Sequence, residues 1–201
     1  SATGKWTGTG SMYFPGGTGN NFMVPATDWG IGTGVYTMDF WIKQESIANA
    51  DRHIVFWTNG IYFNRLSATT FRYGTGNNSS TTIDEIINDS MSDFAHVCIV
   101  RHSSGNTEEV YINGVSKGST ASVTNSVSST DNIYFAENQN SVGSYDWKGF
   151  ISNFRLSKVD RTVSGGDLYN ASGGITVPTA KYTGDGTGTG GGVDSNTVLM
   201  L

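Results

Sequence analysis

The chain has 201 residues, of which 14% are charged, and its 12 basic and 17 acidic side chains give a net charge of −5. Alanine, glutamate, lysine and leucine are scarce while apolar surface is ample, which excludes a long helical bundle and a disordered chain. Cations form no cluster that would suit nucleic acid, and no apolar run approaches the roughly 20 residues that span a bilayer. We therefore expect neither nucleic acid nor a membrane as a partner.

The chain reads as a β protein with tight turns, because it holds 27 glycines, three prolines and 12% aromatic residues. Runs of alternating or apolar residues predict about a dozen strands. In chain order these runs are 11–14, 21–24, 36–43, 54–57, 61–64, 70–73, 81–87, 94–101, 108–113, 115–118, 132–136, 149–158 and 197–201. Asn59-Gly60 and Asn113-Gly114 predict hairpin turns, since Asn-Gly accepts the positive φ angles of a type I′ turn. Repeated antiparallel hairpins predict an all-β fold, a two-sheet antiparallel jelly-roll sandwich.

Five segments together resemble laminin-G-like, concanavalin A-like lectin/glucanase domains. They are SMYFPGGTGNNFMVP (11–25), YTMDFWIK (36–43), FAHVCIVRHSSGNTEEVYINGVSKGS (94–119), WKGFISNFRLSK (147–158) and NTVLML (196–201). This variant of the pattern is similar to modules of marine phage virion proteins. The resemblance implies a concanavalin A-like sandwich and a place in a tail, a fibre or a capsid decoration. It does not choose an activity, because this sandwich hosts lectins, hydrolases and structural modules.

The chain departs from that family at its start, where Pro15 and Asn21 stand at positions that often hold Asp. No apolar strand precedes the first hairpin, and a missing first strand leaves a sheet edge open to other strands. Residues 1–181 are predicted to form the sandwich, and 182–195 to form a Gly-rich linker. Residues 196–201 would then complete a sheet edge in the same or a neighbouring subunit. The residues assigned to this assembly role are Val198, Leu199, Met200 and Leu201.

No catalytic residues are predicted. A glycoside hydrolase needs two carboxylates that flank the scissile bond. Asp84-Glu85 and Glu108-Glu109 are adjacent pairs, which would point to opposite faces of a strand. His96 and Cys98 share one face of the strand over 94–101, but both faces of that strand are apolar, which favours a core histidine and a core cysteine over a nucleophilic site.

Two kinds of ligand site are candidates. Carbohydrate binding would use aromatic rings beside Gly- and Asn-rich turns together with an amide, and the candidate residues are Trp29, Asn138, Tyr145 and Trp147. The alternative is that Trp147 caps the core and Trp29 packs against a loop. No cofactor is predicted, and calcium is the one ion that the loop oxygens would suit. The candidate calcium ligands are Asn20, Asn21, Asp28 and Asp146.

Our main hypothesis from the sequence is a non-enzymatic structural or surface-display module of a virion or another extracellular assembly. Its partners would be other copies of itself or other virion proteins. The alternative is a carbohydrate-binding adhesin domain that recognises host-surface glycans. A glucanase-like enzyme is a third reading, which the spacing of the carboxylates disfavours.

Overall fold

The computed structural model describes residues 5–6, 10–17, 20–25, 29–45, 52–57, 60–65, 70–75, 81–86, 91, 93–104, 106–127, 130–136, 147–182 and 195–201. For residues 52–53, 56, 81–86 and 198–200 it describes the backbone alone. Within these ranges the chain forms thirteen strands and no helix, so none of the described segments is an apolar helix of membrane-spanning length.

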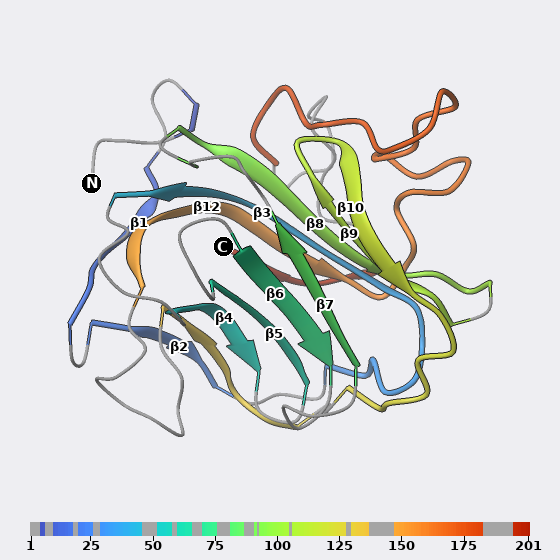
Figure 1. Cartoon of the computed structure of the whole chain (residues 1–201), viewed down its shortest axis with the longest axis horizontal. Helices are drawn as coiled ribbons and strands as arrows, with labels where there is room; N and C mark the ends of the chain where they lie inside the picture. The colour runs from blue at the N-terminus through green and yellow to red at the C-terminus, as the bar shows by residue number, and fades with distance from the viewer. Residues whose placement is uncertain are drawn as a thin grey trace.

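The strands form two antiparallel sheets that lie face to face (Figure 1). The seven-stranded sheet has the order β1 (Met12–Pro15), β12 (Lys148–Ser157), β3 (Tyr36–Gln44), β8 (Ala95–Arg101), β9 (Glu108–Ile112) and β10 (Val115–Thr120), and β13 (Thr197–Met200) also pairs with β12. The six-stranded sheet has the order β2 (Phe22–Val24), β11 (Ile133–Phe135), β4 (Arg52–Trp57), β5 (Ile61–Arg65), β6 (Thr70–Thr75) and β7 (Thr81–Ile86). The predicted two-sheet antiparallel sandwich is confirmed.

Strand β3 shows how the pattern of the sequence positions the core. Its alternate residues Met38, Phe40 and Ile42 are 0–1% exposed and belong to the cluster between the sheets. The Phe40 ring lies 5.9 Å from the ring of Phe63 on β5 and 5.7 Å from that of Phe154 on β12. Each such ring contributes about 1.5–3 kcal/mol through its burial, so these contacts hold the two sheets together.

The hairpin turn at Asn113-Gly114 has the predicted backbone, with φ angles of 50° and 84°. Asn113 also accepts a hydrogen bond from the backbone N–H of His96 through its side-chain Oδ1, at 2.9 Å. This turn therefore joins β9 to β10 and fastens them to the start of β8.

The outer face of the seven-stranded sheet is covered by residues 158–182, the covering segment, which runs beside β8–β10 (Figure 1). Leu168 and Ile175 of the covering segment pack against the outward side chains of β8 and β9, which are Cys98, Val100 and Tyr111. Strand β8 is consequently buried on both faces, with His96 and Cys98 each 0% exposed. The prediction that these two residues belong to the core is confirmed.

A buried ion pair between β12 and β3 anchors the end of the covering segment to the sheet through Tyr182. The Arg155 Nε lies 3.0 Å from Asp39 Oδ1, and both side chains are 0% exposed. The Tyr182 hydroxyl donates to Asp39, and the Arg155 guanidinium lies 3.9 Å from the centre of the Tyr182 ring. Burial alone would raise the pKa of Asp39, but the charge of Arg155 and the hydrogen bond with His96 outweigh it and hold the pKa below its ordinary value.

Tyr182 is therefore anchored to the body of the sandwich, although the sequence places it at the start of the predicted linker. Most of that linker, residues 183–194, lies outside the described residues. The chain is described again from Ser195, and β13 pairs with β12 of the same chain. β1 pairs with residues 148–151 of β12 and β13 with residues 155–157, so the two strands lie end to end along one edge.

Candidate functional site

The first hairpin crosses from one sheet to the other. β1 is the edge strand of the seven-stranded sheet and β2 is the edge strand of the six-stranded sheet. The turn between them begins with Gly16 and Gly17 at φ angles of 73° and 86°, which are rarely adopted by other residues. The Asn20 side-chain nitrogen donates to the carbonyl oxygens of Gly16 at 2.8 Å and of Gly17 at 3.2 Å. These bonds hold the turn and keep the two edge strands apart.

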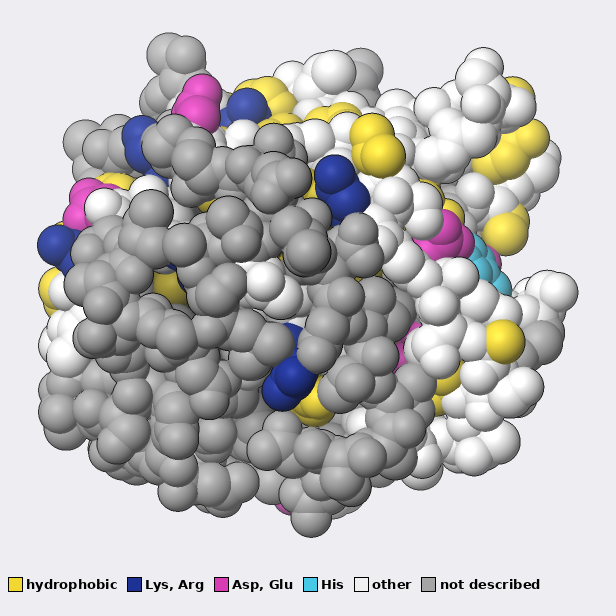
Figure 2. All heavy atoms as spheres, in the orientation of Figure 1, with side chains coloured by type: hydrophobic (Ala, Val, Ile, Leu, Met, Phe, Trp, Pro, Cys, Tyr) yellow, Lys and Arg dark blue, Asp and Glu magenta, His cyan; other side chains and the backbone are white. Residues whose placement is uncertain are grey.

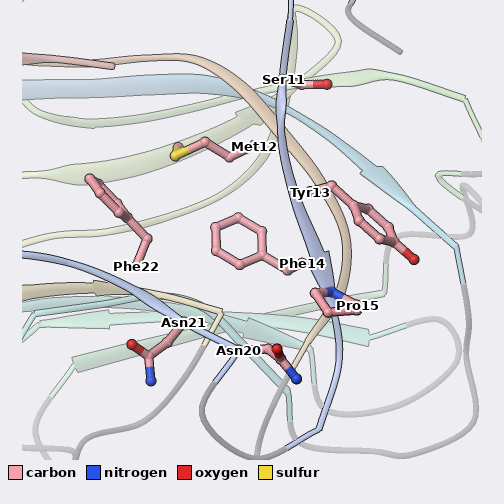
Figure 3. Close-up of a pocket in the computed structure, with 8 residues that line it drawn as sticks. All are labelled: Ser11, Met12, Tyr13, Phe14, Pro15, Asn20, Asn21 and Phe22. Atoms are coloured by element: carbon pink, nitrogen blue, oxygen red, sulfur yellow. The ribbon is translucent and has the colours of Figure 1, made fainter. Parts of the chain in front are cut away.

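An open groove of about 590 Å³ lies between these strands (Figure 3). We call it the edge groove, and it is lined by Ser11, Met12, Tyr13, Phe14, Pro15, Asn20, Asn21 and Phe22. None of these eight side chains carries a charge at neutral pH. The edge groove therefore offers apolar surface, amides and hydroxyls to a ligand, without a fixed charge of its own.

The apolar part of the edge groove comes from both sheets. Phe14 is only 4% exposed, and its ring lies 6.3 Å from that of Trp147. Phe22 is 39% exposed, and its ring lies 6.0 Å from that of Phe135. In Figure 3, Met12 and Phe14 project from one side of β1 and Tyr13 from the other. Tyr13 and Phe22 are similarly exposed, at 40% and 39%, and Phe22 is the exposed ring on the side of β1 from which Phe14 projects.

The polar part of the edge groove is the pair of exposed amides at Asn20 and Asn21. Because the nitrogen of Asn20 serves the turn, a ligand hydroxyl would meet its oxygen, whereas Asn21 can supply a donor and an acceptor. The hydroxyl of Tyr13 donates to Glu45 Oε2 at 2.9 Å, and this hydrogen bond raises the pKa of Tyr13. Tyr13 is therefore oriented by Glu45 at the rim of the groove.

The structure places the candidate residues from the sequence in different surroundings. Asn20 and Asn21 come together in the edge groove. Trp29 is 3% exposed, its ring lies 5.8 Å from that of Trp57, and its Nε1 donates to the carbonyl of Asp131 at 3.0 Å. Trp147 is 1% exposed and packs beside Phe14. Neither indole offers a face to a sugar here, which corrects the expectation that they stack on a glycan. Their burial agrees with the alternative, in which Trp147 caps the core and Trp29 packs against a loop. The remaining candidates, Asp28, Asn138, Tyr145 and Asp146, lie outside the described residues.

Of the four candidate calcium ligands the structure describes only Asn20 and Asn21, so the predicted calcium site is not tested. Across the described ranges, no group of three or more His, Cys, Asp or Glu side chains is arranged to hold a metal ion. Asn20 and Asn21 stay candidates from the sequence, each with one neutral amide oxygen.

The carboxylates that are described have partners that hold them in structural roles. Glu108 is 0% exposed, with Arg101 Nε at 2.8 Å, the Tyr36 hydroxyl at 3.0 Å and the Thr75 hydroxyl at 3.2 Å. Glu109, its neighbour on β9, lies on the opposite face, with His102 Nε2 at 3.2 Å. The prediction that this adjacent pair points to opposite faces is confirmed, so the two carboxylates do not flank a common substrate.

Basic side chains are also separated from one another where Figure 2 shows them. On the described part of the face in Figure 2, Lys and Arg occur singly, without the continuous basic patch that nucleic-acid binding requires.

Asn20 and Asn21 could be named as candidates from the sequence, but the edge groove could not be found there. The sequence feature that corresponds to the groove is the run from Ser11 to Phe22, in which apolar residues flank a Gly-rich turn that carries two amides. The same run would suit a simple hairpin within one sheet. Only the tertiary structure shows that its two strands belong to different sheets and leave a space between them.

Comparison with known proteins supports the architecture. Residues 16–165 match the laminin G family model described as the Concanavalin A-like lectin/glucanases superfamily. A comparison with curated proteins gave no match.

Solved structures with similar folds include the CBM40 module of the Ruminococcus gnavus IT-sialidase bound to alpha2,3 sialyllactose. It is 12% identical, with 75% of this chain and 91% of that chain covered and a TM-score of 0.60. The SAP-like heptameric pentraxin from Limulus polyphemus is 19% identical, with coverages of 72% and 73% and a TM-score of 0.51. The binding domain of Botulinum neurotoxin serotype G is 13% identical, with coverages of 76% and 40% and a TM-score of 0.57. At these identities the likeness shows a common fold.

Proposed function

Because the chain belongs to the concanavalin A-like lectin/glucanases superfamily, we propose that it is a non-enzymatic, surface-located module that binds carbohydrate in the edge groove. Domains of this fold are typically extracellular binding domains, and two of the similar structures are a carbohydrate-binding module and a toxin binding domain. We therefore favour the carbohydrate-binding adhesin hypothesis over a purely structural role.

The observation that carries the proposal is the composition of the edge groove. A sugar presents apolar C–H faces and hydroxyl groups together, so its site needs an accessible ring beside amide donors and acceptors. The edge groove has the 39% exposed ring of Phe22 and the buried ring of Phe14 on its apolar side, and the amides of Asn20 and Asn21 at its turn, where the Asn21 side chain points away from Phe22 (Figure 3). Such a few polar groups over an apolar base are characteristic of small-molecule sites.

The same composition indicates a neutral saccharide. An anionic sugar would gain from a cation that pairs with its carboxylate or sulfate. The eight lining residues supply none, and the Lys148 ammonium nearby lies 3.6 Å from the carboxylate of Glu45. The module from Ruminococcus gnavus was crystallised with a sialylated sugar. We expect the present chain to prefer uncharged glycans.

A glycan array tests this function with the full chain and two variants. Phe22→Ala removes the accessible ring of the groove, and Tyr169→Ala removes a ring of similar exposure, 42%, from the covering segment. Losing about 1.4 kcal/mol of apolar contact at Phe22 would weaken binding about tenfold, whereas the Tyr169 variant should bind like the unaltered chain. Absence of binding to every glycan, or equal loss in both variants, would reject the edge groove as the site.

A second candidate is the structural or surface-display role in a virion or similar assembly. It is favoured by the exposed apolar side chains at the two open sheet edges, which are Tyr13 at 40%, Phe22 at 39% and Met23 at 41%. Open edges with apolar side chains favour contact with another chain. Light scattering of the purified chain and electron microscopy of the native material would distinguish this structural role from carbohydrate binding. The structural role requires regular contacts between copies of the chain in the absence of glycan.

A further inference from the structure

The terminal strand β13 fills a defined slot on the outer edge of β12. Leu201 and Phe154 exchange two backbone hydrogen bonds, of 3.0 and 2.9 Å, and the N–H of Lys158 donates to the carbonyl of Asn196 at 2.8 Å. At one end of the slot, β1 already pairs with β12 as far as Ile151. The slot therefore accepts a short extended segment, and Asn196–Leu201 occupies it from end to end.

The slot is built by the body of the protein. Arg161 bonds to Thr197 Oγ1 on β13 at 3.0 Å, but its Nε also donates to Ser157 Oγ at 2.8 Å and its backbone N–H to Thr37 Oγ1 at 3.0 Å. Its guanidinium also lies 3.4 Å from Asp167 Oδ1. These contacts hold Arg161 in place whichever chain supplies the strand.

The strand is joined to the body through a long sequence. Tyr182, the last described residue before the gap, is 6% exposed and bonded to Asp39. Twelve residues, 183–194, separate it from Ser195, and six of the twelve are glycine. Fully extended, twelve residues reach roughly 40 Å, which is enough to pass from one domain of this size to a neighbour.

We propose that residues 196–201 of one copy occupy the β12 slot of a second copy, so that the chain assembles by strand exchange. The inference goes beyond carbohydrate binding and does not depend on it. The contacts within the slot are the same in the closed and the exchanged forms, so the balance between them is set by concentration. Because residues 183–194 tether the strand to its own chain, the effective concentration of the strand at the slot of that chain is of the order of 1 mM. Exchange is therefore expected where copies are packed at similar concentrations, and reciprocal exchange gives a closed dimer.

Two singly substituted full-length chains test the proposal. Lys158 and Asn196 are both exposed and lie opposite each other just beyond the ends of β12 and β13, joined by the backbone hydrogen bond given above. Lys158→Cys and Asn196→Cys therefore place the two thiols in different chains. The native Cys98 is 0% exposed and is the one cysteine of the sequence. A disulfide between the variants in an oxidised mixture can form in the slot only if the strand has been exchanged.

The effective concentration of a strand at the slot of its own chain is about 1 mM. Raising the total protein concentration of the mixture from about 0.1 to about 1 mM should therefore increase the cross-linked fraction about fivefold. The double variant K158C/N196C is the positive control and should close within one chain. Val115 is 59% exposed on the far edge strand β10, so V115C mixed with N196C measures chance collisions. A cross-linked fraction in the K158C and N196C mixture that does not exceed this collision level would overturn the proposal.

Discussion

Replacing Asp39 by alanine tests the most deeply buried electrostatic contact of the sandwich. Asp39 and Arg155 are both 0% exposed, and Asp39 also accepts the hydroxyl of Tyr182. The substitution leaves the Arg155 charge buried with its remaining partner, Asp167, at 2.6 Å. Removing one member of a buried ion pair costs about 3–5 kcal/mol, because the desolvated partner is not rehydrated.

Asp167 provides the matched control. Its carboxylate is also bonded to Arg155 but is 24% exposed, so Asp167→Ala lets water replace the lost partner. We expect it to cost about 1 kcal/mol, close to the value for exposed pairs. For a domain of 150–250 residues, about 4 kcal/mol lowers Tm by roughly 8–16 °C.

Urea unfolding followed by tryptophan fluorescence measures both variants. The account predicts that Asp39→Ala lowers the free energy of unfolding at least twice as much as Asp167→Ala. Equal and small losses in the two variants would contradict a stabilising role for the buried Asp39–Arg155 pair, to which Tyr182 of the covering segment is bonded.

Two further predictions concern the same fold. His102 places its two ring nitrogens 2.8 Å from Asp160 and 3.2 Å from Glu109, and its hydrogen bond to Asp160 raises the pKa of the imidazole. The stabilisation by the protonated ring should be complete below the pKa of His102 in the unfolded chain, about 6.5, and should be lost as the pH rises through the higher pKa of the folded state. NMR titration of His102, and unfolding at several pH values compared with the His102→Ala variant, would check this. Gly149→Ala would place a Cβ 2.3 Å from the carbonyl of Lys43, so we expect a loss of about 1–3 kcal/mol in a thermal unfolding assay, and unchanged stability would contradict the close approach of β12 to β3.

The strands were largely predictable from the sequence because their residues alternate with period two and their turns carry Asn-Gly or Gly-Gly. The run from Phe94 to Arg101 also indicated a strand buried on both faces. What covers the outer face was not predictable, since residues 158–182 form no regular strand and meet Cys98 and Tyr111 only in three dimensions. Similarly, Trp29 and Trp147 follow turns in the sequence, but their burial depends on distant neighbours such as Trp57 and Phe14.

The edge groove illustrates the same limit. Local pattern shows that residues 12–15 and 22–24 are extended, but their partners, β12 and β11, follow more than a hundred residues later. Pairing with those distant strands decides that the hairpin crosses between sheets and that Phe22 remains accessible. Long-range pairing of this kind is absent from any short window of sequence.

The most direct test of the carbohydrate proposal is an NMR titration of the isotopically labelled full chain with a panel of neutral and sialylated oligosaccharides. We expect a neutral sugar to shift the amide signals of residues 12–14 and 20–22, and Phe22→Ala to raise the sugar concentration needed for these shifts about tenfold while the fold is retained. Shifts confined to other parts of the molecule, or a response only to the sialylated sugars, would contradict a neutral-glycan site in the edge groove.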